Sequence, residues 1–179
     1  LKFHIKKAAL GCAALLTFGL AACGEKEEPQ TETRLYRDGT YTAQFDTAGA
    51  DGYTTYAVVE IASDKVSVTE FDGKNASGEL RSADTELADS MKEGASEYLT
   101  FEPTPANLSK KAMEDFAAAG GDPDSMALTA GGPEYGLELA ALVDAVLDGP
   151  AKADSESGST QVEVPYYADG SYNRYVRSG

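Results

Sequence analysis

The chain has 179 residues, of which 30 are Asp or Glu and 15 are Lys or Arg, so its formal net charge at pH 7 is −15. Such a charge repels nucleic acid and anionic lipid headgroups, so we expect no nucleic-acid partner. The single histidine, His4, lies in the N-terminal segment, which we expect to be cleaved off as a signal peptide. This excludes His-based catalytic triads and His–metal sites from the remaining chain.

The N-terminal segment has the layout of a secretory signal. Lys2, Lys6 and Lys7 form a basic start, and residues 8–20 are mostly apolar but too few to span a bilayer as a stable helix. The sequence L-A-A-C that ends at Cys23 resembles a bacterial lipobox. The resemblance implies cleavage before Cys23 and diacylation of its thiol, with palmitate-type chains. We therefore expect a signal peptide over 1–22 and a lipid anchor on the extracytoplasmic face of a bacterial cell membrane. An ordinary signal peptide with a chance cysteine is the alternative.

Removal of residues 1–22 takes away three lysines and no acidic residue, which brings the net charge to −18. A chain this acidic is held at a membrane by lipid rather than by charge. No later stretch is long and apolar enough to cross a membrane. The acidic residues do not have the spacing of a Ca²⁺-binding loop, so we expect no metal site.

The rest of the chain divides by composition. Residues 23–34 are polar and read as a disordered tether, residues 35–148 carry periodic apolar positions typical of one domain, and residues 149–164 read as a polar linker. The hexapeptide Y-R-D-G-T-Y at 36–41 recurs as Y-A-D-G-S-Y at 167–172. We therefore interpret residues 165–179 as a tail or as the start of a truncated second repeat, although turn-plus-aromatic pieces also recur by chance.

The domain begins with strands and continues with helices. Alternating apolar and β-branched residues predict strands over 40–45, 56–61 and 65–71, with a hairpin at Ser63 and Asp64. Apolar residues at helical spacing predict helices over 85–99, around 108–119, and from Pro133 to the Gly149-Pro150 stop. This order predicts an α+β fold, a small antiparallel sheet with helices packed on one face.

Four blocks in order carry a resemblance to a known family. They are D-G-T-Y-T-A-Q-F at 38–45, D-G-Y-T-T-Y-A-V-V-E-I at 51–61, F-D-G-K-N-A-S-G-E-L-R-S at 71–82 and E-L-A-D-S-M-K at 86–92. Together they resemble the FMN-binding domain of bacterial electron-transfer lipoproteins, which is similar to the flavin-bearing subunits of Na⁺-translocating quinone reductase and Rnf complexes. The resemblance implies a redox carrier rather than a stand-alone enzyme. It also implies a membrane quinol-oxidising donor, and a flavin transferase that attaches FMN through its phosphate to a threonine.

The attachment motif of that family is degenerate in this chain. The corresponding stretch runs D-P-D-S-M-A-L-T-A-G-G-P-E-Y. Counting back from Tyr135 places Thr129 at the attachment position, whereas counting forward from Asp124 places Ala130 there. Thr129 is the only threonine in the stretch, so it is the candidate for a covalent bond.

The same stretch has the features of a phosphate site. Thr129, Ala130, Gly131 and Gly132 precede a predicted helix, whose N-terminus attracts anions, and glycines allow close approach of the backbone. An ordinary flexible connection is an equally good interpretation. Tyr53 and Tyr56, before the central strand, are candidate contacts for the flavin ring. The alternative function is a lipoprotein of the same fold without cofactor, acting as a surface binding module.

Overall fold

The computed structural model describes residues 34–167. The predicted signal segment, Cys23, most of the tether and all but the first residue of the hexapeptide at 167–172 lie outside the described residues. Three strands follow one another as an antiparallel meander: β1 (Gly39–Phe45), β2 (Thr54–Ala62) and β3 (Lys65–Lys74). Ser63 and Asp64 have φ values of 52° and 61°, the left-handed conformation that a tight hairpin needs. The predicted strands and hairpin are thus confirmed.

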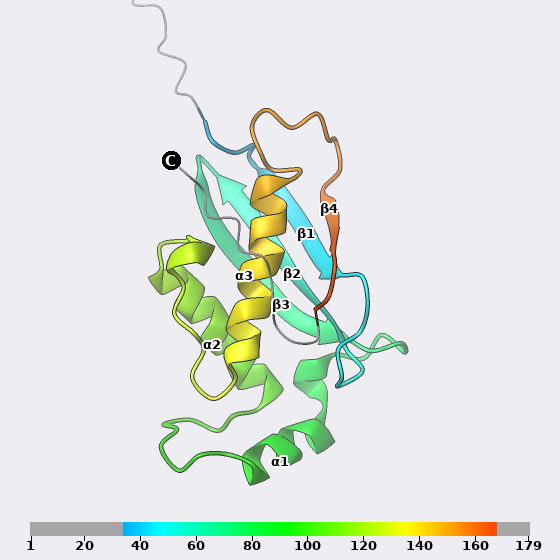
Figure 1. The fold of residues 1–179 in the computed structure, drawn as a ribbon, viewed down its shortest axis with the longest axis vertical. Coiled ribbons are helices and arrows are strands. Elements are labelled where there is room, and N and C mark those ends of the chain that lie inside the picture. The colour runs from blue at the N-terminus through cyan, green and yellow to red at the C-terminus, as the bar shows by residue number, and fades with distance from the viewer. Residues whose placement is uncertain (1–33, 168–179) are drawn as a thin grey trace, which may run out of the picture. The chain divides into compact units, whose positions relative to one another are not determined.

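A fourth strand, β4 (Gln161–Val164), pairs with β1 in parallel, which gives the order β3-β2-β1-β4 (Figure 1). The small antiparallel sheet predicted for the N-terminal strands is confirmed. The parallel strand β4, which was not predicted from the sequence, makes the complete sheet mixed. The prediction of a linker over 149–164 is corrected for these last four residues. The strand escaped notice because it is short, follows a polar run, and offers only Val162 and Val164 as alternating apolar residues.

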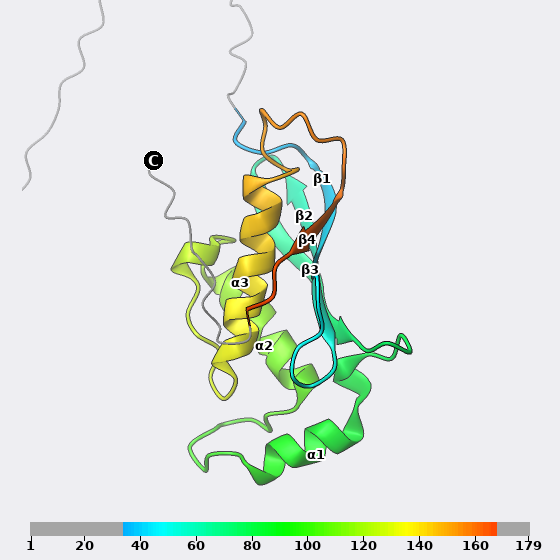
Figure 2. The same ribbon diagram turned by 45° about the vertical axis from the view of Figure 1, so that its right-hand side comes forward.

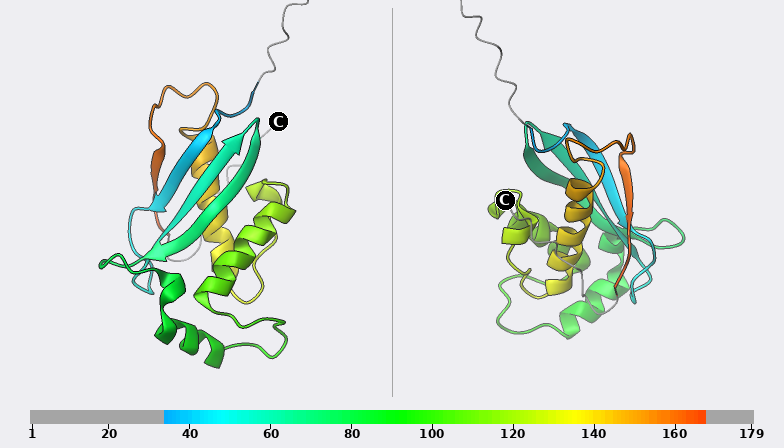
Figure 3. Two further views of the ribbon diagram at one scale, coloured as in Figure 1. Left: turned by 180° about the vertical axis from the view of Figure 1, so that it is seen from behind. Right: turned by 45° about the horizontal axis from the view of Figure 1, so that its top comes forward.

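Three helices follow the meander: α1 (Thr85–Glu93), α2 (Pro105–Ala118) and α3 (Pro133–Asp148). Two short 3₁₀ turns complete the order: η1 (Arg81–Ala83) comes directly before α1, and η2 (Pro123–Ser125) lies between α2 and α3. Helices α2 and α3 cover one face of the sheet, as the view from behind shows (Figure 3). The α+β fold with helices on one face is confirmed. Helix α1 is shorter than predicted because it ends at Gly94.

The core lies between the sheet and the helices α2 and α3. The sheet contributes Tyr41, Ala43 and Phe45 of β1 together with Ala57, Val59 and Ile61 of β2. The helices contribute buried apolar residues at helical spacing: Leu108, Ala112, Phe116, Leu139, Leu142, Val143, Val146 and Leu147. Burial of these side chains holds the two helices against the sheet.

Helix α1 lies at the edge of this core, where Met91 packs against it. It has no buried residue, and it lies beyond the end of the sheet, below the N-terminal end of α3 (Figures 1 and 2). Its N-terminus is fixed by Asp84, whose carboxylate accepts the Leu87 N–H at 2.9 Å and the Tyr53 hydroxyl at 2.8 Å. The space between α1 and the body of the domain is where the candidate site lies.

Candidate functional site

The predicted phosphate loop leads directly into α3, but the Thr129 side chain faces inward. Thr129 is 1% exposed, and its hydroxyl has no hydrogen-bond partner in residues 34–167. It packs against the first turn of α3, since a Cβ built on Gly136 would lie 3.0 Å from Thr129 Oγ1. A flavin transferase therefore cannot reach this hydroxyl unless the loop opens, whereas the adjacent Ala130 is exposed but offers no hydroxyl.

The N-terminus of α3 differs from those of the other two helices. Asp84 caps α1 and Thr104 caps α2, but no side chain of residues 34–167 caps α3, which begins at Pro133 after Gly132. The Gly132 N–H donates to the Thr129 carbonyl at 3.3 Å, so this backbone donor already has a partner within the loop. The positive end of the α3 dipole is nonetheless left without a capping oxygen.

A hollow of about 440 Å³ opens beside this loop. Its lining is mostly apolar and comes from α1, the segment after it and the phosphate loop: Met91, Gly94, Ala95, Ser96, Leu99, Pro103 and Gly131. Gly131 has a φ of 81°, and a Cβ there would lie 2.9 Å from a methyl carbon of Leu99. The position thus needs glycine both for its backbone and for its close approach to Leu99.

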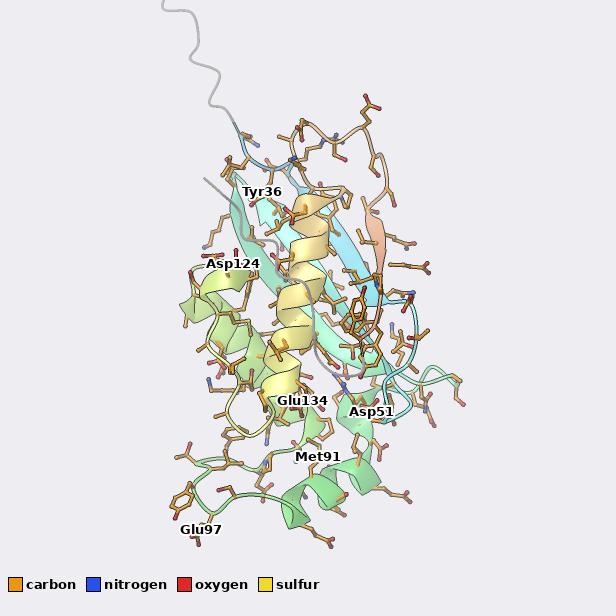
Figure 4. The ribbon with its side chains drawn as sticks, in the orientation of Figure 1. Tyr36, Asp51, Met91, Glu97, Asp124 and Glu134 are labelled. Atoms are coloured by element: carbon orange, nitrogen blue, oxygen red, sulfur yellow. The ribbon has the colours of Figure 1, made fainter. Side chains whose placement is uncertain are left out.

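A second hollow of about 260 Å³ adjoins the first, with Met91 of α1 lining both. It lies between α1, the β1–β2 loop and the first turns of α3, where Asp51, Met91 and Glu134 point toward one another (Figure 4). The rest of its lining is Ala50, Arg81, Leu87, Tyr135, Glu138 and Tyr166. We refer to the two hollows together as the α1 groove.

The polar part of the groove is a charge cluster, here called the Arg81 cluster, made of the buried Arg81 and Glu138 and the partly exposed Asp51. Arg81 is 3% exposed, and its Nη1 lies 3.4 Å from Asp51 Oδ2 and 3.5 Å from Glu138 Oε2. The guanidinium carbon lies 4.4 Å from the ring centroid of Tyr135. Nε and Nη2 have no hydrogen-bond partner among the described residues.

Charge and burial act against each other in this cluster. Burial by itself would lower the pKa of Arg81, but the neighbouring Tyr135, Glu138 and Asp51 raise that pKa overall, so the guanidinium stays charged. Burial raises the pKa of Glu138, and the opposing influence of Arg81 and of the Thr55 hydroxyl, which donates to Glu138 Oε2 at 3.0 Å, does not cancel the rise. The cluster thus holds one firm cation beside a carboxyl group that takes up protons more readily than usual.

The two predicted ring contacts have different positions. Tyr53 is buried and holds the N-terminus of α1 through Asp84, which raises the pKa of the Tyr53 hydroxyl. Tyr56 lies on the face of the sheet that the helices leave open, where its hydroxyl donates to Glu70 and Lys74 lies 4.3 Å above its ring. Tyr53 therefore positions a wall of the groove, and Tyr56 is not part of it.

Asp124, the remaining candidate, lies on η2, exposed and far from Glu134 and the groove (Figure 4). The structure therefore brings the Thr129–Gly132 loop to the groove but leaves Asp124 outside it. Sequence reasoning missed the Arg81 cluster. A signal was present in α3, since Glu138 falls three residues after Tyr135 and four before Leu142, a carboxylate on an otherwise apolar face.

Residues 34–167 lack two features, a membrane-spanning helix and a group of metal-ligating side chains. No helix there has both the length and the apolar character to span a membrane. The same residues contain no group of three or more His, Cys, Asp or Glu side chains placed to hold a metal ion.

Comparison with known proteins places the fold and goes no further. No protein-family profile matches the chain, and no curated protein matches it. The crystal structure of the CPE2226 protein from Clostridium perfringens is similar, with a TM-score of 0.58 and 18% sequence identity. The match covers 74% of this chain and 100% of the clostridial chain. At this identity the likeness supports the α+β fold alone.

Proposed function

We propose that the chain is a lipid-anchored, extracytoplasmic electron-transfer protein that binds FMN in the α1 groove without a covalent bond. In this proposal it accepts electrons from a quinol-oxidising donor in the membrane and passes them on. The observation that carries the proposal is that Gly131 lines the larger hollow. The Thr129–Gly132 loop, which the sequence predicts to bind a phosphate, therefore borders a space lined mostly by apolar side chains.

The dimensions and chemistry of the groove support a ligand of this kind. The larger hollow, at about 440 Å³, is in the size range of small-molecule sites, which are apolar with a few polar groups, and the smaller hollow adds about 260 Å³. The uncapped N-terminus of α3 favours an anion at one place along it. Met91 and Leu87 of α1 line the smaller hollow with apolar side chains, and Met91 also packs against the edge of the core.

The burial of Thr129 favours reversible binding over attachment. The hydroxyl packs against Gly136 and is 1% exposed, so ester formation would require the 126–132 loop to open. A flavin transferase is therefore not needed in this proposal.

A protein without cofactor that binds a partner at its surface remains the second candidate. The observation that favours it is Glu134, an acidic residue in the first turn of α3. Its carboxylate already interacts favourably with the helix dipole and would repel a phosphate at the same place. The affinity for FMN decides between the two candidates.

The test titrates the full chain with FMN and follows the quenching of flavin fluorescence. Ser96→Trp places a bulky ring in the larger hollow, and we expect it to weaken binding at least about tenfold, or about 1.4 kcal/mol. Glu93→Trp adds the same ring at an exposed position of α1 outside both hollows and should bind FMN as the parent does. No binding by the parent chain would favour the cofactor-free module.

The proposed anchor has its own test. Cys23→Ser removes the thiol that would carry the lipid. Two acyl chains anchor a protein stably to a membrane, so the variant, which lacks them, should leave the membrane fraction of the producing bacterium. A protein that stays with the membranes through a high-salt wash would contradict the lipobox interpretation.

A further inference from the structure

We infer that the Arg81 cluster recognises the imide edge of the flavin ring, where one N–H lies between two carbonyl groups. Arg81 donates to a ring carbonyl, and Asp51 accepts the ring N–H. This inference rests on the proposed binding of FMN and names the part of the groove that would select for the ring.

The first support is the incomplete pairing of Arg81. A guanidinium carries five N–H donors, yet only Nη1 has partners in the described part of the chain. Its two contacts, at 3.4 and 3.5 Å, are longer than the 2.7–2.9 Å of a good charge-assisted bond. Buried donors without acceptors are costly and rare, so the cluster lacks an acceptor that a bound molecule would supply.

The second support is the mixture of charges around the hollow. A molecule that only accepts hydrogen bonds, such as a phosphate or a carboxylate, would be repelled by Asp51 and Glu138. A molecule that only donates would be repelled by Arg81. A planar edge with acceptor, donor and acceptor in a row satisfies both kinds of group, because it meets the guanidinium and a carboxylate side by side.

Asp51 is the more exposed of the two carboxylates. Glu138 is 7% exposed and already accepts the Thr55 hydroxyl at 3.0 Å. The Asp51 side chain is 28% exposed on the β1–β2 loop, and its Oδ2 faces Arg81 while its Oδ1 accepts the Tyr53 N–H at 3.1 Å. Asp51 thus combines access to the hollow with a fixed orientation.

The spacing along α3 fits a molecule with a phosphate at one end and a ring at the other. Glu138 follows Gly132 by six positions, which corresponds to about 9 Å along the helix axis. A five-carbon chain and part of a flat ring bridge such a distance, and the shared lining residue Met91 lies along the way. The walls of the smaller hollow include Leu87, Met91 and the rings of Tyr135 and Tyr166, surfaces suited to a flat aromatic system.

The test compares the affinities of FMN and N3-methyl-FMN for the full chain by fluorescence titration. The methyl group removes the ring N–H, so we expect N3-methyl-FMN to bind at least tenfold more weakly to the parent protein. In Asp51→Ala this preference should fall to about twofold or less, because the acceptor is gone. Glu134→Gln changes an acidic residue that lines the same hollow outside the cluster and should keep the preference.

The outcomes separate this inference from the proposed function. Equal binding of the two flavins by the parent chain would overturn the edge recognition and leave FMN binding standing. A full preference in Asp51→Ala, or its loss in Glu134→Gln, would also overturn the role given to Asp51. Failure to bind either flavin would overturn both proposals. Thermal melting of each variant checks that it is folded, and Asp51 is exposed enough for its substitution to leave the core intact.

Discussion

Helices α3 and α1 have the same amphipathic spacing and opposite roles. Nine residues of α3 are buried, and its apolar face packs into the core against the sheet. Helix α1 has no buried residue: Leu87 and Met91 line the groove, and Met91 packs only partly buried against the edge of the core. Apolar periodicity therefore predicts that a helix has an apolar face, but not whether that face meets a core or a binding site. Each prediction below tests this difference.

The largest expected effect comes from truncating one leucine in each helix. Leu139→Ala leaves a cavity under α3, where the side chain is fully buried, and should lower the free energy of unfolding by about 2–5 kcal/mol. Leu87→Ala removes a side chain that is only partly buried and should cost less than about 1 kcal/mol. Urea denaturation measures both values. Equal losses would mean that α1 belongs to the core.

The next effect concerns the N-terminus of α1. Asp84→Ala removes the cap of this helix and the acceptor of the Tyr53 hydroxyl, and loss of a cap typically costs about 1 kcal/mol. We expect hydrogen exchange to quicken in residues 85–93 and to stay unchanged in α3. Asp89→Ala alters an exposed carboxylate of the same helix that pairs with Lys92, and it serves as the control. Faster exchange in both helices would show that α1 and the core open as one unit.

The smallest effect is a change in pH dependence. Because burial raises the pKa of Glu138 above its ordinary value of about 4.5, the folded state binds this proton more tightly than the unfolded state. Glu138 therefore contributes stability below pH 4.5 that is lost as the pH rises through its raised pKa. Glu138→Gln lacks this dependence. Its free energy of unfolding should therefore rise relative to that of the parent as the pH increases from 4.5 through the raised pKa of Glu138. Urea titrations from pH 4.5 upward check the sign, and parallel curves would contradict it.

The sequence predicted most of the fold because the apolar patterns of the meander and of α2 and α3 are regular. It missed β4, since four residues with two valines after a polar run carry little signal. It extended α1 to residue 99, because Ala95 and Tyr98 continue the stripe beyond Gly94, yet Tyr98 is 86% exposed outside the helix.

The site was predictable only in its local part. The Thr129–Gly132 loop and the start of α3 are adjacent in the chain, so turn and helix signals reveal them. The Arg81 cluster joins residues 51, 81 and 138, which come from a loop, a 3₁₀ turn and a helix. Only the packing of these elements brings the three side chains together. The inward orientation of Thr129 likewise depends on its packing against Gly136.

The position of the groove within the domain has a consequence for electron delivery. Tyr36, just before β1, and Met91 of α1 lie at opposite ends of the domain (Figure 4). If Cys23 carries the proposed anchor, the ten residues from 24 to 33 join the lipid to the end that holds Tyr36, and fully extended they reach about 35 Å. The groove lies at the end of the domain away from Tyr36, near which the tether would join. A donor embedded in the bilayer would have to extend past the body of the domain, or the domain would have to turn over on its tether between receiving an electron and releasing it.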